Sequence, residues 1–164
     1  MIFVTVGSRQ YPFDRLFKKL DELYDKQLIT EPLFAQTGNI TYVPKNYDYK
    51  PYISPEEFDQ HMKECDIVIC HGASGSIMKA LNLKKKVIAV ARLRKYKEHI
   101  NDHQIQNNEA FSSHHYVLMA DPELDNLAEC IDKIKRGEDG LIEWVNEDPM
   151  RIVNIIDDFI QKNW

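Results

Sequence analysis

One segment of the sequence combines glycine, hydroxyl and imidazole groups between a predicted strand and a predicted helix. It reads His71-Gly72-Ala73-Ser74-Gly75-Ser76 and follows the apolar run 66–70. Glycines let a backbone approach a ligand closely, and the first turn of a helix offers free N–H groups with a partial positive charge. Diphosphate is the natural ligand of such a turn. A tight turn capped by serine explains the same pattern, so both interpretations stay open on this segment alone.

A second polar segment, residues 92–104, follows another predicted strand and is dense in hydrogen-bonding groups. His99 and His103 are four residues apart, so a helix there would place both on one face, as a metal pair requires. The segment is not an HExxH motif and no third ligand is obvious nearby. Recognition of sugar hydroxyls or phosphate by Asp102, His103 and Gln104 is therefore favoured over a metal. A polar loop in which Asp102 caps the next helix is the alternative.

Apolar periodicity predicts that strands and helices alternate along the chain. The strands are expected at 1–6, 32–37, 66–70, 87–90 and 115–119. Helices are expected at 13–25, 55–64, 122–135 and 149–163, with two more that follow the polar segments and end near residues 83 and 111. Residues 40–53 show no clear period and are expected to form a long loop. The pattern predicts an α/β domain over residues 1–164, with a parallel sheet covered on both faces and a C-terminal amphipathic helix.

Each glycine-rich or polar segment follows a predicted strand. Gly7-Ser8 comes after the first strand and Gly38-Asn39 after the second, and the two polar segments come after the third and fourth. Ligands of parallel sheets bind beyond the carboxyl ends of the strands. We therefore expect these segments to converge on one edge of the sheet.

Composition excludes several classes of function. The 164 residues carry a net charge of −5, whereas a nucleic-acid-binding domain is typically basic. No apolar run approaches the length of a membrane span, and no secretory signal is evident at the first residues. The three cysteines form no CxxC pair and are expected to be reduced thiols in the cytoplasm.

Three motifs, in this order, resemble those of the PssE-like proteins. They are Val4-Thr5-Val6-Gly7 with Pro12-Phe13-Asp14-Arg15-Leu16; Asp66 to Leu81 with His71-Gly72 and Gly75-Ser76; and Arg92, Lys95-Tyr96, Glu98-His99 and Asp102-His103-Gln104. The similarity extends from residue 1 to about 135. The PssE-like proteins are similar to the C-terminal, donor-binding half of family 28 glycosyltransferases such as MurG. They also resemble the cytosolic subunit of the eukaryotic transferase that adds the second GlcNAc to dolichol diphosphate.

This resemblance implies a Rossmann-like sheet of the GT-B type, as one half of an inverting hexosyltransferase. The other half would be a separate, membrane-associated chain that brings a lipid-linked acceptor. The implied donor is a UDP-sugar, with galactose or GlcNAc transferred in exopolysaccharide or capsule assembly, as in a β-1,4-galactosyltransferase subunit. The chain would lie in the cytoplasm and reach the inner membrane face through its partner. No metal or cofactor is implied, because helix dipoles and side chains stabilise the leaving UDP in this class.

The same resemblance assigns roles to individual residues. Gly7 and Ser8 would face the diphosphate, the segment 71–76 would cradle the nucleotide, and residues 102–104 would contact the sugar. The resemblance implies a general base on the partner or at the interface and assigns none in this chain, where His71 and Glu98 are the candidate catalytic residues. The candidate substrate-binding residues are Gly7, Ser8, Gly38, His71, Gly72, Ala73, Ser74, Gly75, Ser76, Lys79, Arg92, His99, Asp102, His103 and Gln104.

Four positions depart from the family pattern. Ala73 and Lys85 replace glycines, Ala91 replaces a proline, and Lys79 replaces a glutamate that grips the ribose diol. A carboxylate that accepts from hydroxyls contributes about 1.5–3 kcal/mol, and lysine cannot accept. Because helical side chains point back toward the N-terminus, the Lys79 ammonium is hypothesised to reach the diphosphate instead.

Two other functions compete with the donor-binding enzyme subunit. Lys79 and Ala73 also fit a non-catalytic accessory subunit that stabilises or regulates a membrane glycosyltransferase. A nucleotide hydrolase of the phosphoribohydrolase type has a similar glycine loop before a glutamate. That glutamate is absent here, and the motif Asp102-His103-Gln104 has no place in such an enzyme.

Overall fold

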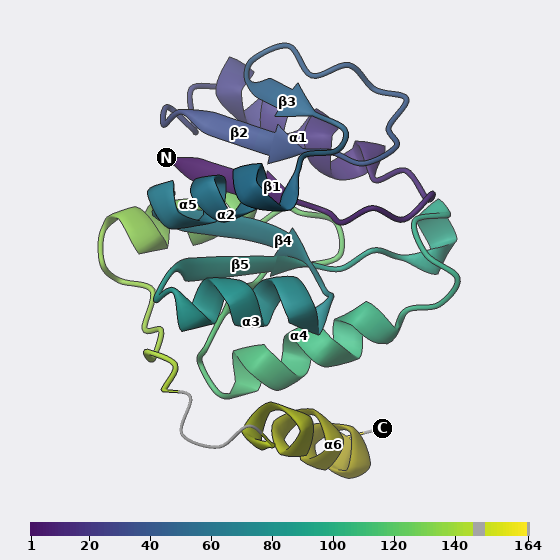
Figure 1. Cartoon of the computed structure of the whole chain (residues 1–164), viewed down its shortest axis with the longest axis vertical. Helices are drawn as coiled ribbons and strands as arrows, with labels where there is room; N and C mark the ends of the chain where they lie inside the picture. The colour runs from purple at the N-terminus through teal and green to yellow at the C-terminus, as the bar shows by residue number, and fades with distance from the viewer. Residues whose placement is uncertain (146–149, 164) are drawn as a thin grey trace.

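Six parallel strands form one sheet in the order β3-β2-β1-β4-β5-β6 (Figure 1). This computed structural model describes residues 1–145 and 150–163. The strands are β1 (Ile2–Thr5), β2 (Leu33–Gln36), β3 (Asp48–Lys50), β4 (Ile67–His71), β5 (Lys86–Val90) and β6 (Leu118–Met119). The order is that of a doubly wound Rossmann sheet, in which the chain changes direction between β1 and β4. The predicted α/β class and parallel sheet are confirmed.

Helices cover both faces of the sheet, as Figure 1 shows. The helices are α1 (Asp14–Asp25), α2 (Pro55–Glu64), α3 (Ser74–Asn82), α4 (His103–Ser113), α5 (Leu127–Lys135) and α6 (Arg151–Asn163), with a short 3₁₀ helix, η1 (Arg94–Tyr96). Val4 and Ile69 pack in a core with residues of α1 and α5, whereas Phe3 and Val68 pack in a second core with residues of α2, α3 and α4. Because successive strand residues point to opposite faces, the central strands must be apolar throughout, which is why the sequence marks them clearly.

The helix expected at 55–64 begins and ends where the sequence predicts. The Ser54 hydroxyl accepts a hydrogen bond from the backbone N–H of Glu57 at 3.1 Å, and Pro55 occupies the first helical position. Serine at the N-cap and proline directly after it are typical of a helix start. This cap fixes where α2 starts beside the carboxyl end of the sheet.

Several expected boundaries are wrong. Residues 40–53 were expected to form a loop, but Asp48–Lys50 pair with β2 as a short edge strand. The helix expected from 122 begins at Leu127, because the Asp121 carboxylate holds the preceding turn through the N–H groups of Asp125 and Asn126. The strand expected at 115–119 covers Leu118–Met119 alone. Position 149, the expected start of the last helix, lies outside the described residues.

The last helix, α6, lies beside α4 at the end of the molecule farthest from β3 (Figure 1). Ile155 is buried there, and Ile152, Ile156 and Phe159 pack partly against the second core. Part of the apolar face of α6 is thus buried against the rest of the chain. None of the helices in residues 1–145 and 150–163 combines the length and apolar character needed to cross a membrane.

Candidate functional site

The loops that follow β1, β2 and β4 meet at the carboxyl edge of the sheet, toward which all arrows in Figure 1 point. Gly7, after β1, has a φ of +75°, and a Cβ there would lie 3.0 Å from Nε2 of His71. Gly38, after β2, has a φ of +61°, and a Cβ there would lie 3.1 Å from the carbonyl oxygen of Gly7. Glycine suits both positions because it tolerates positive φ and permits this close approach.

The segment after β4 packs against the start of α4. A Cβ on Gly72 would lie 2.6 Å from Cβ of Gln104 and 2.8 Å from Oδ1 of Asn108, so no larger residue fits without a shift. The Asn107 side chain also donates a hydrogen bond to the carbonyl of Gly72 at 3.2 Å. The structure therefore brings residues 7–8, 71–76 and 102–104 to one edge, as the alternation of strands and helices predicts.

The first turn of α3 has uncapped backbone donors. Ala73 is the N-cap, and its side chain offers no acceptor. Within the described part of the chain, the backbone N–H groups of Ser74, Gly75 and Ser76 make no hydrogen bond. A Cβ on Gly75 would meet nothing within 4 Å. The serine-capped turn is thus not what the structure shows, and the open helix terminus is suited to an anion.

A cleft of about 300 Å³ lies over this turn. It is lined by Arg9, His71, Gly72, Ala73, Ser74, Gly75, His99, Asn101, His103, Gln104 and Asn107. Most of these residues belong to the candidate set from the sequence. Arg9, Asn101 and Asn107 were missed. Arg9 lies in the loop after β1, a position that the sequence could have indicated.

A second cleft, of about 240 Å³, adjoins the first. It is lined by Thr5, Gly7, Ser8, Gln36, Tyr52, Ile53, Pro55, Phe58 and Ser76. The two clefts share a border, since Ser76 follows Gly75 and Gly7 packs against His71. Six of these lining residues were missed by the sequence analysis: Thr5, Gln36, Tyr52, Ile53, Pro55 and Phe58. The aromatic side chains at 40–53 and the position of this segment before α2 were the available signal.

His71 is 6% exposed and lies at the centre of this edge. Burial, together with the positive charge of Arg92, the nearby His99 imidazole and the positive charge of Arg9, lowers the pKa of His71 to about 3. The imidazole is therefore neutral at physiological pH. It is a neutral hydrogen-bonding group, with no charge of its own to contribute.

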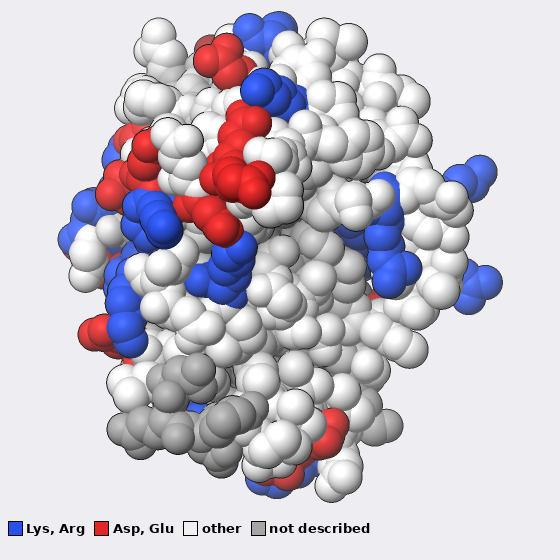
Figure 2. All heavy atoms as spheres, in the orientation of Figure 1, with Lys and Arg blue, Asp and Glu red and all other residues white. Residues whose placement is uncertain are grey.

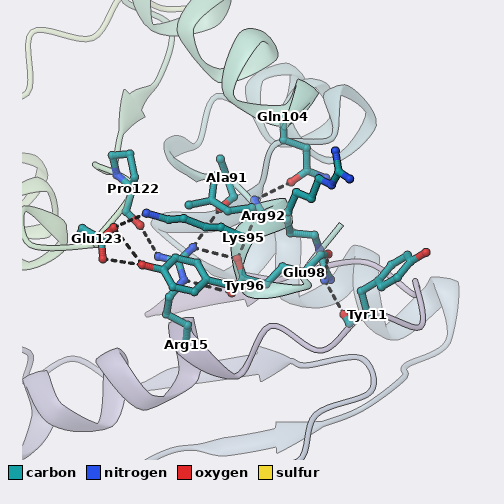
Figure 3. A network of polar contacts seen from close by, with 12 residues as sticks. Tyr11, Arg15, Ala91, Arg92, Lys95, Tyr96, Glu98, Gln104, Pro122 and Glu123 are labelled. Carbon is teal, nitrogen blue, oxygen red and sulfur yellow. Dashed lines mark hydrogen bonds and ion pairs between the residues drawn. The ribbon is translucent and has the colours of Figure 1, made fainter. Parts of the chain in front are cut away.

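Arg92 and Glu98 belong to a network of polar contacts within the chain (Figure 3). The Arg92 side chain, 1% exposed, donates to the carbonyls of Val6 at 2.5 Å and Tyr11 at 2.6 Å. The Glu98 carboxylate, 2% exposed, accepts from Arg15 at 3.0 and 3.1 Å and from the N–H of Leu93 at 3.0 Å. Neither residue lines the two clefts described above, so their predicted contacts with substrate stay predictions.

Three further candidates have contacts that the sequence did not predict. Lys79 forms an ion pair with Asp59, and its Nζ lies 4.8 Å from the centre of the Phe58 ring. The Asp102 side chain accepts from the N–H of Arg94 at 2.8 Å and does not cap α4. His99 lies outside α4, so it shares no helix face with His103. Among the described residues, no group of three or more metal-ligating side chains is found.

The sequence profile of the glycosyltransferase family 28 C-terminal domain matches residues 1–147. The chain belongs to this family. The match confirms the family part of the resemblance seen in the sequence. It covers every residue of the two clefts, so the cleft-lining loops are part of the family 28 domain itself.

Solved structures agree with the fold of this family 28 domain. An NMR solution structure of ALG13 has a TM-score of 0.64 and 18% sequence identity, with 94% of each chain covered. MurG from Acinetobacter baumannii has a TM-score of 0.60 and 15% identity, with 96% of this chain but 49% of MurG covered. The chain thus spans nearly all of ALG13 and about half of MurG. Comparison with curated protein sequences finds no significant match.

Proposed function

We propose that this family 28 domain binds the UDP-sugar donor of a two-chain glycosyltransferase. The observation that carries this proposal is the open first turn of α3. The N–H groups of Ser74, Gly75 and Ser76, which make no hydrogen bond among the described residues, lie between a polar cleft and a partly aromatic one. A diphosphate placed at this helix terminus would be stabilised by the N–H groups and by the helix dipole.

The two clefts suit the two ends of a nucleotide sugar. Tyr52 and Phe58 supply apolar and aromatic surface on one side of the turn, which suits a planar base. Asn101 and His103 supply polar groups on the other side, which suit sugar hydroxyls. Basic side chains project from the right-hand edge of the molecule, where Figure 1 places η1 (Figure 2). Arg9, which lines the polar cleft, adds positive charge for the diphosphate.

The proposed reaction is inverting transfer of a hexose. The bond between the anomeric carbon and the diphosphate oxygen breaks, and its electron pair leaves on UDP. A hydroxyl of the acceptor attacks the opposite face of the anomeric carbon, and its proton passes to a base. We place that base on the partner chain. In this chain, the N–H groups of α3 would stabilise the charge that develops on UDP.

A membrane-associated partner that brings a lipid-linked acceptor completes the proposal. The chain covers 49% of MurG but 94% of ALG13, which supports a half that works with a second chain. The PssE-like motifs support galactose or GlcNAc as the hexose and exopolysaccharide or capsule assembly as the setting. The chain would then act in the cytoplasm at the inner membrane face.

Calorimetric titration of the full chain with UDP tests the proposal. We expect saturable heat, and hexose transfer once the partner chain is added. No heat at millimolar UDP, with and without the partner, would overturn donor binding. UDP binding without transfer in the presence of an active partner would instead support an accessory subunit, for which the Lys79–Asp59 ion pair at the expected ribose position is the supporting observation.

A further inference from the structure

The side-chain amide of Gln104 has one allowed orientation. Its Oε1 accepts hydrogen bonds from the backbone N–H of Gly72 at 3.3 Å and of Arg92 at 3.0 Å. A flipped amide would place an NH₂ group against two N–H donors, and both donors would then lose their partner in a buried site. The Nε2 of Gln104 must therefore face Nδ1 of His71, 3.3 Å away.

This orientation determines where His71 carries its proton. The Gln104 NH₂ group can only donate, so Nδ1 of His71 must accept and cannot be protonated. We propose that Gln104 is a positioning residue that holds His71 as a neutral imidazole with its proton on Nε2, ready to donate to an anionic ligand. That the ligand is the diphosphate of a UDP-sugar rests on the proposed function.

The Nε2 edge of His71 is left available by a glycine. A Cβ on Gly7 would lie 3.0 Å from Nε2 and 3.2 Å from Cε1, so any side chain there would crowd this edge of the ring. Among the described residues, no oxygen accepts a hydrogen bond from Nε2. His71 also lines the polar cleft. The donor is therefore present, oriented and without an acceptor within the described chain.

The surroundings of His71 disfavour a second proton. Arg92 and Arg9 carry positive charge, His99 faces the same cleft, and Glu98 is paired with Arg15 instead. The low pKa of His71 agrees with the geometry. A neutral donor keeps its hydrogen bond to phosphate across the physiological range, whereas an ordinary histidine would change charge near pH 6.5.

This role differs from the sugar contact that the resemblance implies for Gln104. Both lone pairs of Oε1 are used by backbone donors, and one N–H is used by His71. The amide has no acceptor left for a sugar hydroxyl. The contact that the structure shows for the amide nitrogen is the one to His71, and the proposed role of Gln104 rests on that contact.

Two-bond ¹H–¹⁵N correlation spectra of the full chain test the proposal. They distinguish a protonated from an unprotonated imidazole nitrogen, and the His71 signals are assigned by their loss in His71→Gln. We expect Nε2 to be protonated, Nδ1 to be unprotonated and neither to titrate between about pH 5 and pH 8. Protonation on Nδ1, or titration in that range, would overturn the inference.

The variant Gln104→Glu provides an isosteric test. One carboxylate oxygen still accepts from Gly72 and Arg92, while the other now favours a proton on Nδ1. We expect Nδ1 to become protonated, while Gln106→Glu keeps the wild-type pattern. Gln106 lies on the same helix and, among the described residues, makes no hydrogen bond with His71 or Gly72. An unchanged spectrum in folded Gln104→Glu would contradict the positioning role.

UDP titration separates this inference from the proposed function. From about pH 7 to pH 9, above the ionisation of a terminal phosphate, we expect wild-type affinity to be flat and Gln104→Glu to lose about tenfold as the pH rises. The loss arises because Nε2 then presents a lone pair to the phosphate. If the Nε2 proton is found but UDP does not bind, the proposed function fails and the tautomer assignment stands. If UDP binds but Nδ1 is protonated, the proposed function stands and the tautomer assignment fails.

Discussion

The Arg92 guanidinium donates a hydrogen bond to the carbonyl of Val6 at 2.5 Å, although 86 residues separate them in the sequence. The contact joins the ends of β1 and β5, on either side of β4. A further bond to the carbonyl of Tyr11 holds the loop that contains Gly7 and Arg9. The loops that form the clefts are therefore tied together from behind by one buried cation.

Replacing Arg92 by methionine should destabilise the fold strongly. The buried carbonyls of Val6, Tyr11 and Glu98 would lose their donor, and we expect the free energy of unfolding to fall by about 3 kcal/mol. Arg94→Met, at an exposed position in η1, should change it by less than about 0.5 kcal/mol. Urea unfolding of both variants provides the comparison. Equal stability of the two variants would show that the Arg92 hydrogen bonds do not hold these loops together.

Two glycines of the β4–α3 segment should respond in opposite ways to alanine. Gly72→Ala forces a Cβ against Gln104 and Asn108, so we expect a loss of about 1–3 kcal/mol. Gly75→Ala adds a Cβ in open space within a helix and should stabilise the protein by up to about 1 kcal/mol. Thermal unfolding measures both. If Gly72→Ala leaves the stability unchanged, α4 does not lie as close to Gly72 as the structure shows.

An acid at position 73 should separate stability from ligand binding. The N-cap conformation of Ala73 is extended, so Ala73→Asp can accept from the free N–H groups of α3 and stabilise the protein by about 1 kcal/mol. The same carboxylate would repel a diphosphate, and we expect UDP affinity to fall at least tenfold.

Asn82→Asp, at the other end of α3, is the matched control for Ala73→Asp. It adds the same charge far from the N-terminus and should leave UDP affinity unchanged. Undiminished UDP affinity in Ala73→Asp would place the phosphate elsewhere.

His71 should make stability depend on pH. Its folded pKa, about 3, lies below its ordinary value, so the unfolded chain binds more protons between those limits. The free energy of unfolding should therefore rise with pH from about 3 to 6.5 and be lost on acidification, by up to about 1.4 kcal/mol per unit for this group. His71→Gln keeps a neutral N–H and should remove this contribution. Parallel pH profiles of the two proteins would contradict a buried neutral imidazole.

Particular residues show why sequence predicted some features and missed others. The apolar runs at β1, β4 and β5 mark a buried parallel sheet, and Ser54-Pro55 marks the start of α2. In contrast, β3 has three residues, Asp48 and Lys50 are exposed, and its pairing with β2 leaves no apolar signature.

The polar segment 92–104 is ambiguous for a different reason. Groups that bind a ligand and groups that bind the backbone look alike in sequence. The side chains of Arg92, Glu98 and Gln104 make hydrogen bonds within the chain, and only the three-dimensional structure reveals these partners. The convergence of glycine turns on one edge was predictable because it follows from topology alone.

The position of α4 has a mechanical consequence. On one side this helix is wedged against Gly72, where there is no room for a methyl group, and on another it lies beside α6. Helix α4 therefore connects α6 to the turn beneath the polar cleft. A neighbour that pressed α6 toward α4 would therefore act on the same helix that packs against Gly72.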